Sequence, residues 1–143
     1  MRVLVINGPN LNMLGQREPD LYGKIGLEEI NDRLREVARQ QQVEIDFFQS
    51  NHEGEIIDRV QIAQGNTDAI IINAGALTHY SVALLDALKA VAIPFVEVHM
   101  SNIYAREEFR HRSLLSAAAR GGIFGLGADG YRLALLAVCE WFK

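Results

Sequence analysis

The sequence predicts an α/β fold in which a doubly wound, five-stranded parallel sheet carries helices on both faces. The 143-residue chain alternates short apolar runs with longer segments of helical period, which is the pattern of consecutive βα units. No internal repeat, low-complexity tract or linker interrupts this alternation. The hydrophobic fraction of 49% suits one buried core and is too high for a disordered chain. We therefore expect a single domain over residues 1–143.

Five short apolar runs are predicted to be the strands of this sheet. They cover residues 3–6, 43–49, 69–73, 95–98 and 123–126. Turn-forming residues close the first run, which is followed by Asn-Gly-Pro. Continuous apolar runs of this length are typical of strands that are buried on both faces. Five such strands fit the flavodoxin-like sheet, whose strand order is 2-1-3-4-5.

Helices are predicted between the strands, over residues 27–41, 54–64, 81–91 and 107–119, with a last helix that Asp129 caps. The first of them has a clear helical period, because its apolar residues share one face: Leu27, Ile30, Leu34, Val37 and Ala38. In the last helix, the residues expected to face inward are Leu133, Leu136 and Val138.

Composition and charge exclude several functional classes. The net charge of −4 argues against a protein that neutralises many nucleic-acid phosphates. No apolar run approaches the roughly 18 residues of a membrane helix, and the apolar run at the start is too short for a signal peptide. The single cysteine, Cys139, excludes an internal disulfide and fits a reducing compartment. We therefore expect a cytoplasmic protein without nucleic-acid or membrane partners.

Polar side chains concentrate after the strands, at the edge where open parallel sheets bind ligands. After the first strand come Asn10, Arg17 and Tyr22; after the third, Asn73 and His79; after the fourth, His99, Ser101, Arg106 and Arg110. The first connection, residues 7–24, is far longer than the usual roughly 2–6 residues. It is predicted to be a lid or a binding segment over this edge.

Several familiar motifs are absent or misplaced. Residues 125–130 match G-x-G-x-x-G, but they belong to the last βα unit, and the chain ends before an acidic residue about 20 positions on. The four histidines lack the spacing of a zinc site, and no G-x-S-x-G surrounds Ser81. Lys24, Lys89 and Lys143 occupy a loop, a late helix position and the last residue, so none suits a Schiff base.

The remaining candidates for acid–base chemistry are histidines and tyrosines near arginines. Arg17 lies five residues from Tyr22 in the same long connection. A guanidinium favours the charged form of a neighbouring phenol, so this pair suits the removal of a carbon-bound proton, with a histidine as the matching acid. Asparagine side chains and backbone N–H groups can hold an enolate or a carboxylate. These residue types indicate an elimination or isomerisation on a small anionic carbonyl compound.

Five motifs along the chain resemble those of the type II 3-dehydroquinate dehydratases. They are residues 7–23 (NGPNLNMLGQREPDLYG), 50–55 (SNHEGE), 73–79 (NAGALTH), 97–103 (EVHMSNI) and 125–131 (GLGADGY). Their order and spacing match over essentially the whole chain. The resemblance implies a flavodoxin-like shikimate-pathway enzyme that removes water from 3-dehydroquinate to give 3-dehydroshikimate, without metal, cofactor or Schiff base. It also implies a homo-oligomer, a dodecamer built from trimers.

The resemblance further assigns roles by position in the motifs. The catalytic residues would be Tyr22 as the base for the C2 proton, His99 as the acid for the departing hydroxyl, Glu97 to orient His99, and Arg17, Arg106 and Asn10 to stabilise tyrosinate and enolate. The substrate-binding residues would be Asn73, His79, Arg110, the backbone of Met100 and Ser101, and Asp86 from a neighbouring subunit.

The chain departs from the family pattern in the connection after the third strand. Ala74 stands where proline is usual, Leu77 replaces an aromatic residue, Tyr80 a threonine, and Leu85 a frequent arginine. Without the proline, φ is no longer restricted in a loop that must hold Asn73. A second hypothesis is therefore a binding module on the same fold, although a module that only binds needs neither an acid nor a base.

Overall fold

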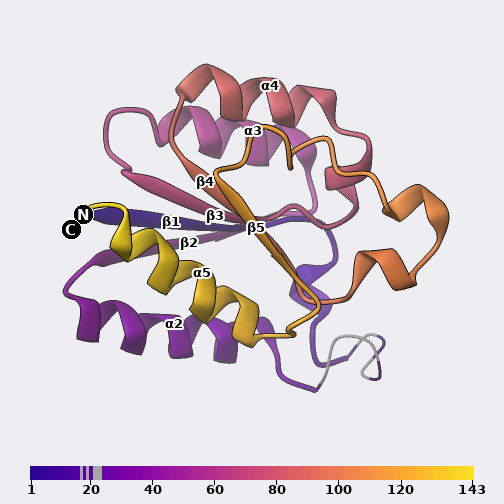
Figure 1. The fold of residues 1–143 in the computed structure, drawn as a ribbon, viewed down its shortest axis with the longest axis horizontal. Coiled ribbons are helices and arrows are strands. Elements are labelled where there is room, and N and C mark those ends of the chain that lie inside the picture. The colour runs from indigo at the N-terminus through magenta and orange to yellow at the C-terminus, as the bar shows by residue number, and fades with distance from the viewer. Residues whose placement is uncertain (17, 19, 21–23) are drawn as a thin grey trace.

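The computed structural model, which describes residues 1–16, 18, 20 and 24–143, contains a five-stranded parallel sheet (Figure 1). Its strands are β1 (Arg2–Asn7), β2 (Glu44–Gln49), β3 (Ala69–Asn73), β4 (Phe95–His99) and β5 (Gly121–Phe124). They lie in the order β2-β1-β3-β4-β5, and every neighbouring pair is parallel. The predicted flavodoxin-like order is confirmed, and it brings the polar ends of the strands to one edge of the sheet.

The helices cover the sheet in two pairs. They are α2 (Leu27–Gln41), α3 (Glu53–Ile62), α4 (Val82–Val91) and α5 (Asp129–Glu140). Figure 1 shows α2 and α5 on one face and α3 and α4 on the other. Side chains of β1 alternate between the two resulting cores, with Val3 and Val5 in one and Leu4 and Ile6 in the other. None of the helices in the described part of the chain is both long and apolar enough to cross a membrane.

The predicted helix over residues 107–119 is wrong. The segment instead forms a short 3₁₀ turn, η4 (Glu108–Arg110), followed by bends and turns up to β5. Ser113 explains the difference, because its Oγ accepts hydrogen bonds from the N–H groups of Leu115 and Ser116, both at 3.1 Å. A hydroxyl that bonds the nearby backbone in this way competes with helical hydrogen bonds. Leu115 anchors the resulting loop, since it is fully buried.

The last strand is displaced from its predicted position. β5 begins at Gly121 rather than at residue 123, and Gly122 pairs with Glu97 of β4. It ends before Gly125, whose φ of 83° lies in the left-handed region that glycine tolerates. The prediction placed the strand too late because two glycines carry no apolar signal, although their backbone pairs normally with β4.

The last helix buries a different face from the one predicted. Its buried side chains include Tyr131, Ala134, Leu135 and Val138, whereas Leu133 and Leu136 are only half-buried. Asp129 does not cap the helix; it is the first helical residue and pairs with Arg132. Close packing sets this rotation, because a Cβ at Gly130 would lie 3.3 Å from the Ile123 side chain. The glycine lets α5 approach β5 and turns Tyr131 inward.

Candidate active site

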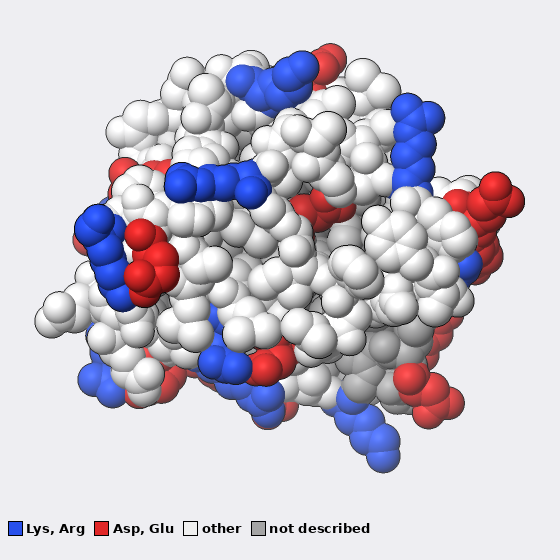
Figure 2. Space-filling model, in the orientation of Figure 1, with Lys and Arg blue, Asp and Glu red and all other residues white. Residues whose placement is uncertain are grey.

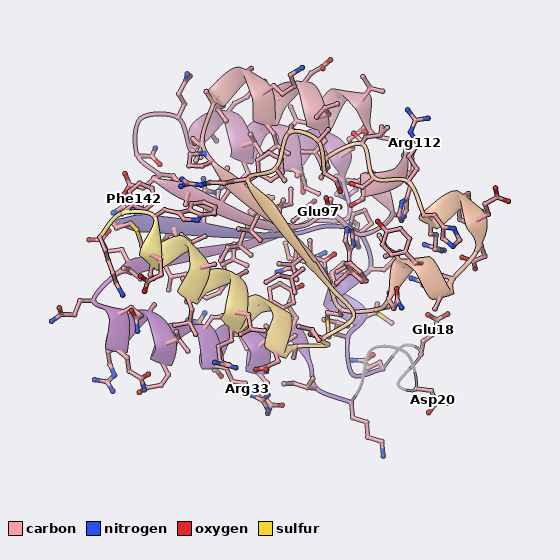
Figure 3. The ribbon with its side chains drawn as sticks, in the orientation of Figure 1. Glu18, Asp20, Arg33, Glu97, Arg112 and Phe142 are labelled. Atoms are coloured by element: carbon pink, nitrogen blue, oxygen red, sulfur yellow. The ribbon has the colours of Figure 1, made fainter. Side chains whose placement is uncertain are left out.

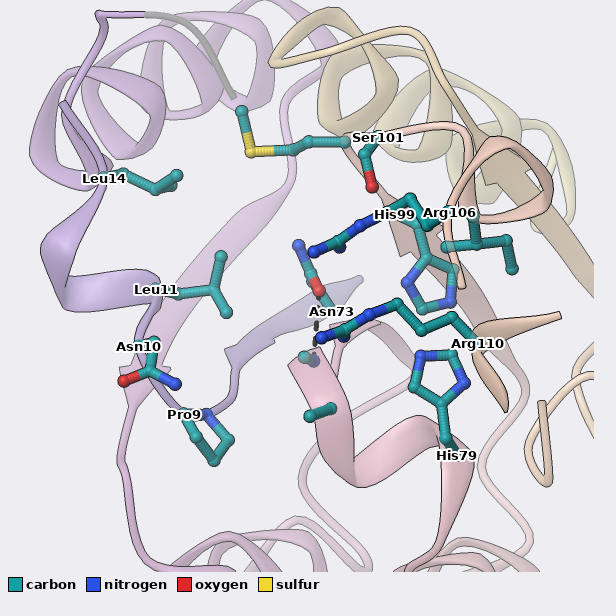
Figure 4. Close-up of a pocket in the computed structure, with 14 residues that line it drawn as sticks. Pro9, Asn10, Leu11, Leu14, Asn73, His79, His99, Ser101, Arg106 and Arg110 are labelled. Carbon is teal, nitrogen blue, oxygen red and sulfur yellow. Dashed lines mark hydrogen bonds between the residues drawn. The ribbon is translucent and has the colours of Figure 1, made fainter. Parts of the chain in front are cut away.

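A cavity of about 160 Å³ opens at the carboxyl ends of β1, β3 and β4 (Figure 4). The residues that line it are Pro9, Asn10, Leu11, Leu14, Asn73, Gly75, Ala76, His79, His99, Met100, Ser101, Ile103, Arg106 and Arg110. Four short 3₁₀ segments contribute to its walls: η1 (Leu11–Met13), η2 (Gly75–His79), η3 (Ile103–Ala105) and η4 (Glu108–Arg110). A mostly apolar wall on one side faces histidines and arginines on the other, an arrangement typical of sites for small polar ligands.

The structure brings eight of the twelve predicted site residues together around this cavity: Asn10, Asn73, His79, His99, Met100, Ser101, Arg106 and Arg110. Glu97 does not line it but bonds His99. Asp86 is exposed on α4 and lies apart from it. Arg17 and Tyr22 lie outside the described residues.

His99 and Glu97 form a buried hydrogen-bonded pair. They are two residues apart on β4, so both side chains point to the same face of the sheet. His99 Nε2 lies 2.5 Å from Glu97 Oε2, and the side chains are only 9% and 3% exposed. Burial by itself would raise the Glu97 pKa, but hydrogen bonds from His99, Ser116 and Ser113 outweigh it, and the pKa is lowered. Glu97 is therefore an anion that holds Nε2–H of His99, which leaves Nδ1 for a ligand.

His79 lies beside His99 and is held as a neutral ring. The two ring centroids are 6.4 Å apart and the planes are nearly parallel. Burial lowers the pKa of His79, and a backbone hydrogen bond to Arg112 opposes this only in part. His79 Nδ1 lies 2.8 Å from the Arg112 carbonyl oxygen. Because a carbonyl only accepts, Nδ1 carries the proton, and Nε2 is left as an acceptor.

Two arginines provide positive charge at the same wall. Figure 4 shows Arg106 and Arg110 extending into the cavity on either side of His99. Arg110 is held from outside by Glu107, three residues earlier, and its guanidinium lies 5.1 Å from the Phe109 ring centroid. Convergent guanidinium groups favour a small anion, and they can bind a carboxylate through two parallel hydrogen bonds.

Asn73 is oriented by a second buried cluster, formed with Tyr131 and Asn7. Asn73 Nδ2 donates to the Tyr131 hydroxyl at 2.9 Å, and that hydroxyl donates to Asn7 Oδ1 at 2.5 Å. Asn73 Oδ1 accepts from the N–H of Gly75 at 3.2 Å. Burial raises the pKa of Tyr131, so its phenol stays protonated and remains a donor. The amide of Asn73 thus reaches the cavity in one fixed orientation.

The loop after β3 has Ala74 in a conformation that a proline would also allow. Ala74 has a φ of −77°, which lies in the range a proline would impose. It is fully buried, and a Cβ at Gly8 would lie 2.4 Å from its carbonyl oxygen. Gly8 therefore allows the first loop to press against Ala74, and this contact supports the loop that holds Asn73.

The start of the first long connection is fixed to the end of β2. Asn10 adopts a left-handed φ of 70°, and its N–H donates to Asn51 Oδ1 at 2.9 Å. Gln49 supports the same oxygen from 3.2 Å and also donates to the Gly8 carbonyl. Gln49 at the end of β2 and Asn51 just after it therefore hold the residues at the cavity entrance. The sequence did not indicate this role for either side chain.

Comparison with known proteins agrees with this geometry. Residues 1–139 match the family described as dehydroquinase class II. The chain belongs to the class II dehydroquinases. The resemblance inferred from five motifs is thereby confirmed.

Its relatives cover nearly the full length of the chain. It is 63% identical over 136 residues to the 3-dehydroquinate dehydratase of Polynucleobacter asymbioticus, covering 94% of this chain and 91% of that protein. It is 54% identical over 143 residues to the enzyme of the same name from Prochlorococcus marinus, covering 100% and 99%. The crystal structure of type II dehydroquinase from Butyrivibrio crossotus superposes with a TM-score of 0.94 at 48% identity, over 96% and 97% of the two chains.

The sequence did not reveal every residue around the site of this class II dehydroquinase. Leu11, Leu14 and Ile103 form apolar walls of the cavity, although the sequence assigned none of them to the site. Ser113 and Ser116 bind Glu97, at 2.7 Å and 2.6 Å. The helix expected over that segment hid their role, because a helical surface serine carries no signal for a contact with a distant strand.

Proposed function

We propose that this class II dehydroquinase eliminates water from 3-dehydroquinate to give 3-dehydroshikimate through an enolate. Tyr22 would be the base that takes the C2 proton, and His99 the acid that protonates the departing hydroxyl, without metal or Schiff base. The observation that carries the proposal is the buried His99–Glu97 pair at the wall of a cavity that also holds Arg106 and Arg110.

His99 suits the acid because of its partner. A hydroxyl departs easily only when a proton reaches it as the C–O bond breaks. The Glu97 carboxylate accepts from Nε2 and fixes the orientation and tautomer of the ring, much as a buried carboxylate does for the histidine of hydrolase triads. The nitrogen that remains, Nδ1, would then carry the proton to the substrate.

The other lining residues support the binding of a hydroxylated carboxylate. Arg110 and the backbone of Met100 and Ser101 would hold the carboxylate group, because they converge on the positive wall of the cavity. Asn73 and the unprotonated Nε2 of His79 would bind ring hydroxyls, one as a donor and one as an acceptor. This division of labour keeps the C2 proton and the hydroxyl to be lost at fixed positions.

The roles of Tyr22 and Arg17 rest on their place in the family motif. Arg17 would stabilise tyrosinate and the enolate, with Arg106 as a second cation, and Asn10 would hold a water on the enolate oxygen. Asn10 lines the cavity at the start of the same connection. Electrostatic stabilisation of an enolate by fixed cations and amides is commonly a large part of such catalysis.

The activity can be measured directly. Incubation with 3-dehydroquinate should produce a conjugated enone, which absorbs in the ultraviolet. A chain that binds the compound without forming the enone at high protein concentration would be a binding module, and the proposal would fail.

The Tyr22→Phe variant tests the base. It should lose at least about a thousandfold in kcat while keeping measurable ligand binding, since only the proton acceptor is removed. Tyr80→Phe is the matched control, because Tyr80 is 63% exposed and does not line the cavity. Undiminished turnover in Tyr22→Phe would show that another group takes the proton.

The absence of a lysine imine has its own test. Treatment with borohydride in the presence of 3-dehydroquinate should leave activity unchanged, because no lysine would form a reducible Schiff base. A chelator should likewise have no effect. Inactivation by borohydride would assign the chemistry to one of the three lysines.

We also propose that the enzyme forms trimers that assemble into a dodecamer, with Asp86 reaching the cavity of a neighbouring subunit. Its exposed position on α4 leaves the carboxylate available for this role. Sedimentation should give the mass of twelve chains.

The role of Asp86 is tested by mixing variants. Mixing Asp86→Ala with Tyr22→Phe subunits after dissociation should restore part of the activity, because some sites then combine an intact Tyr22 with an intact Asp86. Mixed subunits without any gain would place Asp86 outside the site.

The proposed cellular setting is the cytoplasm. It rests on the single cysteine, which fits a reducing compartment. Fractionation of cells that express the full-length gene with a carboxyl-terminal tag should recover the protein with cytoplasmic markers, and recovery with a secreted or membrane fraction would contradict the assignment.

A further inference from the structure

The loop between η4 and β5 places two serine hydroxyls on the carboxylate of Glu97. Ser113 Oγ donates to Oε2 at 2.7 Å, and Ser116 Oγ donates to Oε1 at 2.6 Å. His99 Nε2 approaches Oε2 from the other side at 2.5 Å. Both oxygens of the carboxylate are therefore occupied, and the plane of the group is fixed at three points.

Ser113 Oγ takes part in three hydrogen bonds, one as donor and two as acceptor. Its Oγ already accepts from the N–H groups of Leu115 and Ser116. A hydroxyl has one proton and two lone pairs, so these two bonds and the one donated to Glu97 use its full hydrogen-bonding capacity. The backbone turn that replaces the predicted helix thus aims this hydroxyl at the carboxylate.

Glu97 would be less constrained without these hydroxyls, because a second cavity lies behind it. This cavity has a volume of about 170 Å³ and is lined by residues that include Glu97, His99 and Ser116. Figure 2 shows an acidic side chain recessed in the middle of an uncharged surface, at the position that Figure 3 labels Glu97. Water in this space could bond the carboxylate and let it rotate away from His99.

We propose that Ser113 and Ser116 are positioning residues, which hold Glu97 so that His99 presents its cavity-facing nitrogen to the substrate in one tautomer. Neither serine lines the cavity that holds Arg106 and Arg110, so both act through Glu97. The proposal rests on the function proposed above, in which His99 is the acid. It adds two residues that support His99 through Glu97 and that lie outside the β4 motif, residues 97–103.

Ser116→Ala is the first test, because Ser116 is exposed and its loss should not affect folding. We expect kcat to fall about tenfold, the effect of one lost hydrogen bond to a buried charge, while KM stays within about twofold. Ser116→Thr keeps the hydroxyl and should return kcat to near the wild-type value. Ser113→Ala should lower kcat at least as much, and the double variant further.

Ser50→Ala is the matched control for Ser113→Ala. Ser50 Oγ also accepts a backbone N–H, from His52 at 2.9 Å, and donates to a glutamate, Glu55, at 2.5 Å. It lines neither cavity. The control should lose a similar amount of stability without the change in kcat.

A spectroscopic measurement separates this proposal from the proposed function. In ¹⁵N-labelled protein, the ring shifts of His99, assigned with His99→Asn, should show Nε2–H in the wild type and a growing fraction of Nδ1–H in the serine variants. Unchanged shifts together with wild-type kcat in both alanine variants would overturn the proposal, as would a Ser116→Thr variant as slow as Ser116→Ala. If the wild-type chain showed no dehydration at all, the function would fail, and the nitrogen shifts alone would still decide the role of the serines.

Discussion

Two clusters of buried polar side chains lie under the same cavity, and they differ in charge. Glu97 of β4 is an anion that accepts from His99, Ser113 and Ser116. Asn73 of β3 belongs to a neutral cluster in which the Tyr131 hydroxyl links it to Asn7. In both clusters the buried side chains are hydrogen-bonded to one another, as most buried polar groups are.

Because only one of the two clusters is charged, the two clusters respond differently to a change in pH. Hydrogen bonds to the carboxylate outweigh its burial and lower the pKa of Glu97, whereas burial raises the pKa of Tyr131. The charged cluster therefore changes state in acid, while the neutral cluster stays the same throughout the physiological range. This suits the proposed division, in which His99 is oriented by Glu97 and donates a proton, whereas Asn73 holds a substrate group in place.

The largest expected effect comes from removing the charge. Glu97→Gln keeps the size of the side chain, but its amide can donate to His99 and favour the wrong tautomer. We expect kcat to fall at least about a hundredfold with little change in KM, measured by the enone assay. Glu36→Gln, an exposed glutamate of α2 that pairs with Arg39, should leave kcat unchanged. Equal kcat in wild type and Glu97→Gln would remove the distinction between the two clusters.

Breaking the neutral cluster should instead affect stability first. Tyr131→Phe leaves the Asn7 and Asn73 amides without their shared hydroxyl in a fully buried site, which should cost about 1–3 kcal/mol of unfolding free energy. Urea denaturation would measure this, and KM should rise because Asn73 loses its orientation. Tyr80→Phe, at an exposed position, should change stability by less than about 0.5 kcal/mol. A fully active and stable Tyr131→Phe would mean that the two amides bond each other directly.

Acid should act on one cluster alone. Since the pKa of Glu97 is lowered in the folded chain from its usual 4.5, the unfolded chain takes up this proton first as the pH falls. The stability that Glu97 contributes is thus present above about 4.5 and is lost as the pH drops through the lowered folded value. Urea unfolding at neutral and at acidic pH should show a larger loss for wild type than for Glu97→Gln. Tyr131→Phe should lose as much as wild type.

Breaking an exposed ion pair should have the smallest effect on the free energy of unfolding. It serves as the reference for the buried contacts. Arg33 pairs with Glu29 one turn earlier on α2, at 2.9 Å, and both side chains are more than half exposed. Arg33→Gln should cost only about 0.3–0.5 kcal/mol, and less in high salt. A cost comparable to that of Tyr131→Phe would show that burial does not set the strength of these polar contacts.

Much of the fold and part of the site were predictable from local patterns. β3 and α2 were predicted with the bounds that the structure has, because a buried strand and an amphipathic helix each leave a period in the sequence. The loop of residues 107–119 was not, since Ser113 breaks the helix through its own hydroxyl. Ser116 is exposed to solvent yet donates to Glu97, a contact that composition cannot reveal.

The sequence alone determined the alternation of strands and helices, because this alternation depends on short-range periodicity. The sheet order and the edge at which the polar residues gather followed from the fold class that five βα units fit. Only the tertiary structure decided the rotation of α5, the cluster around Asn73 and the two serines on Glu97. The Tyr131 hydroxyl bonds Asn7 across 124 residues of chain, and Ser116 meets Glu97 across 19. Contacts between distant segments depend on how helices and loops pack against the sheet, and no local pattern of residues encodes that packing.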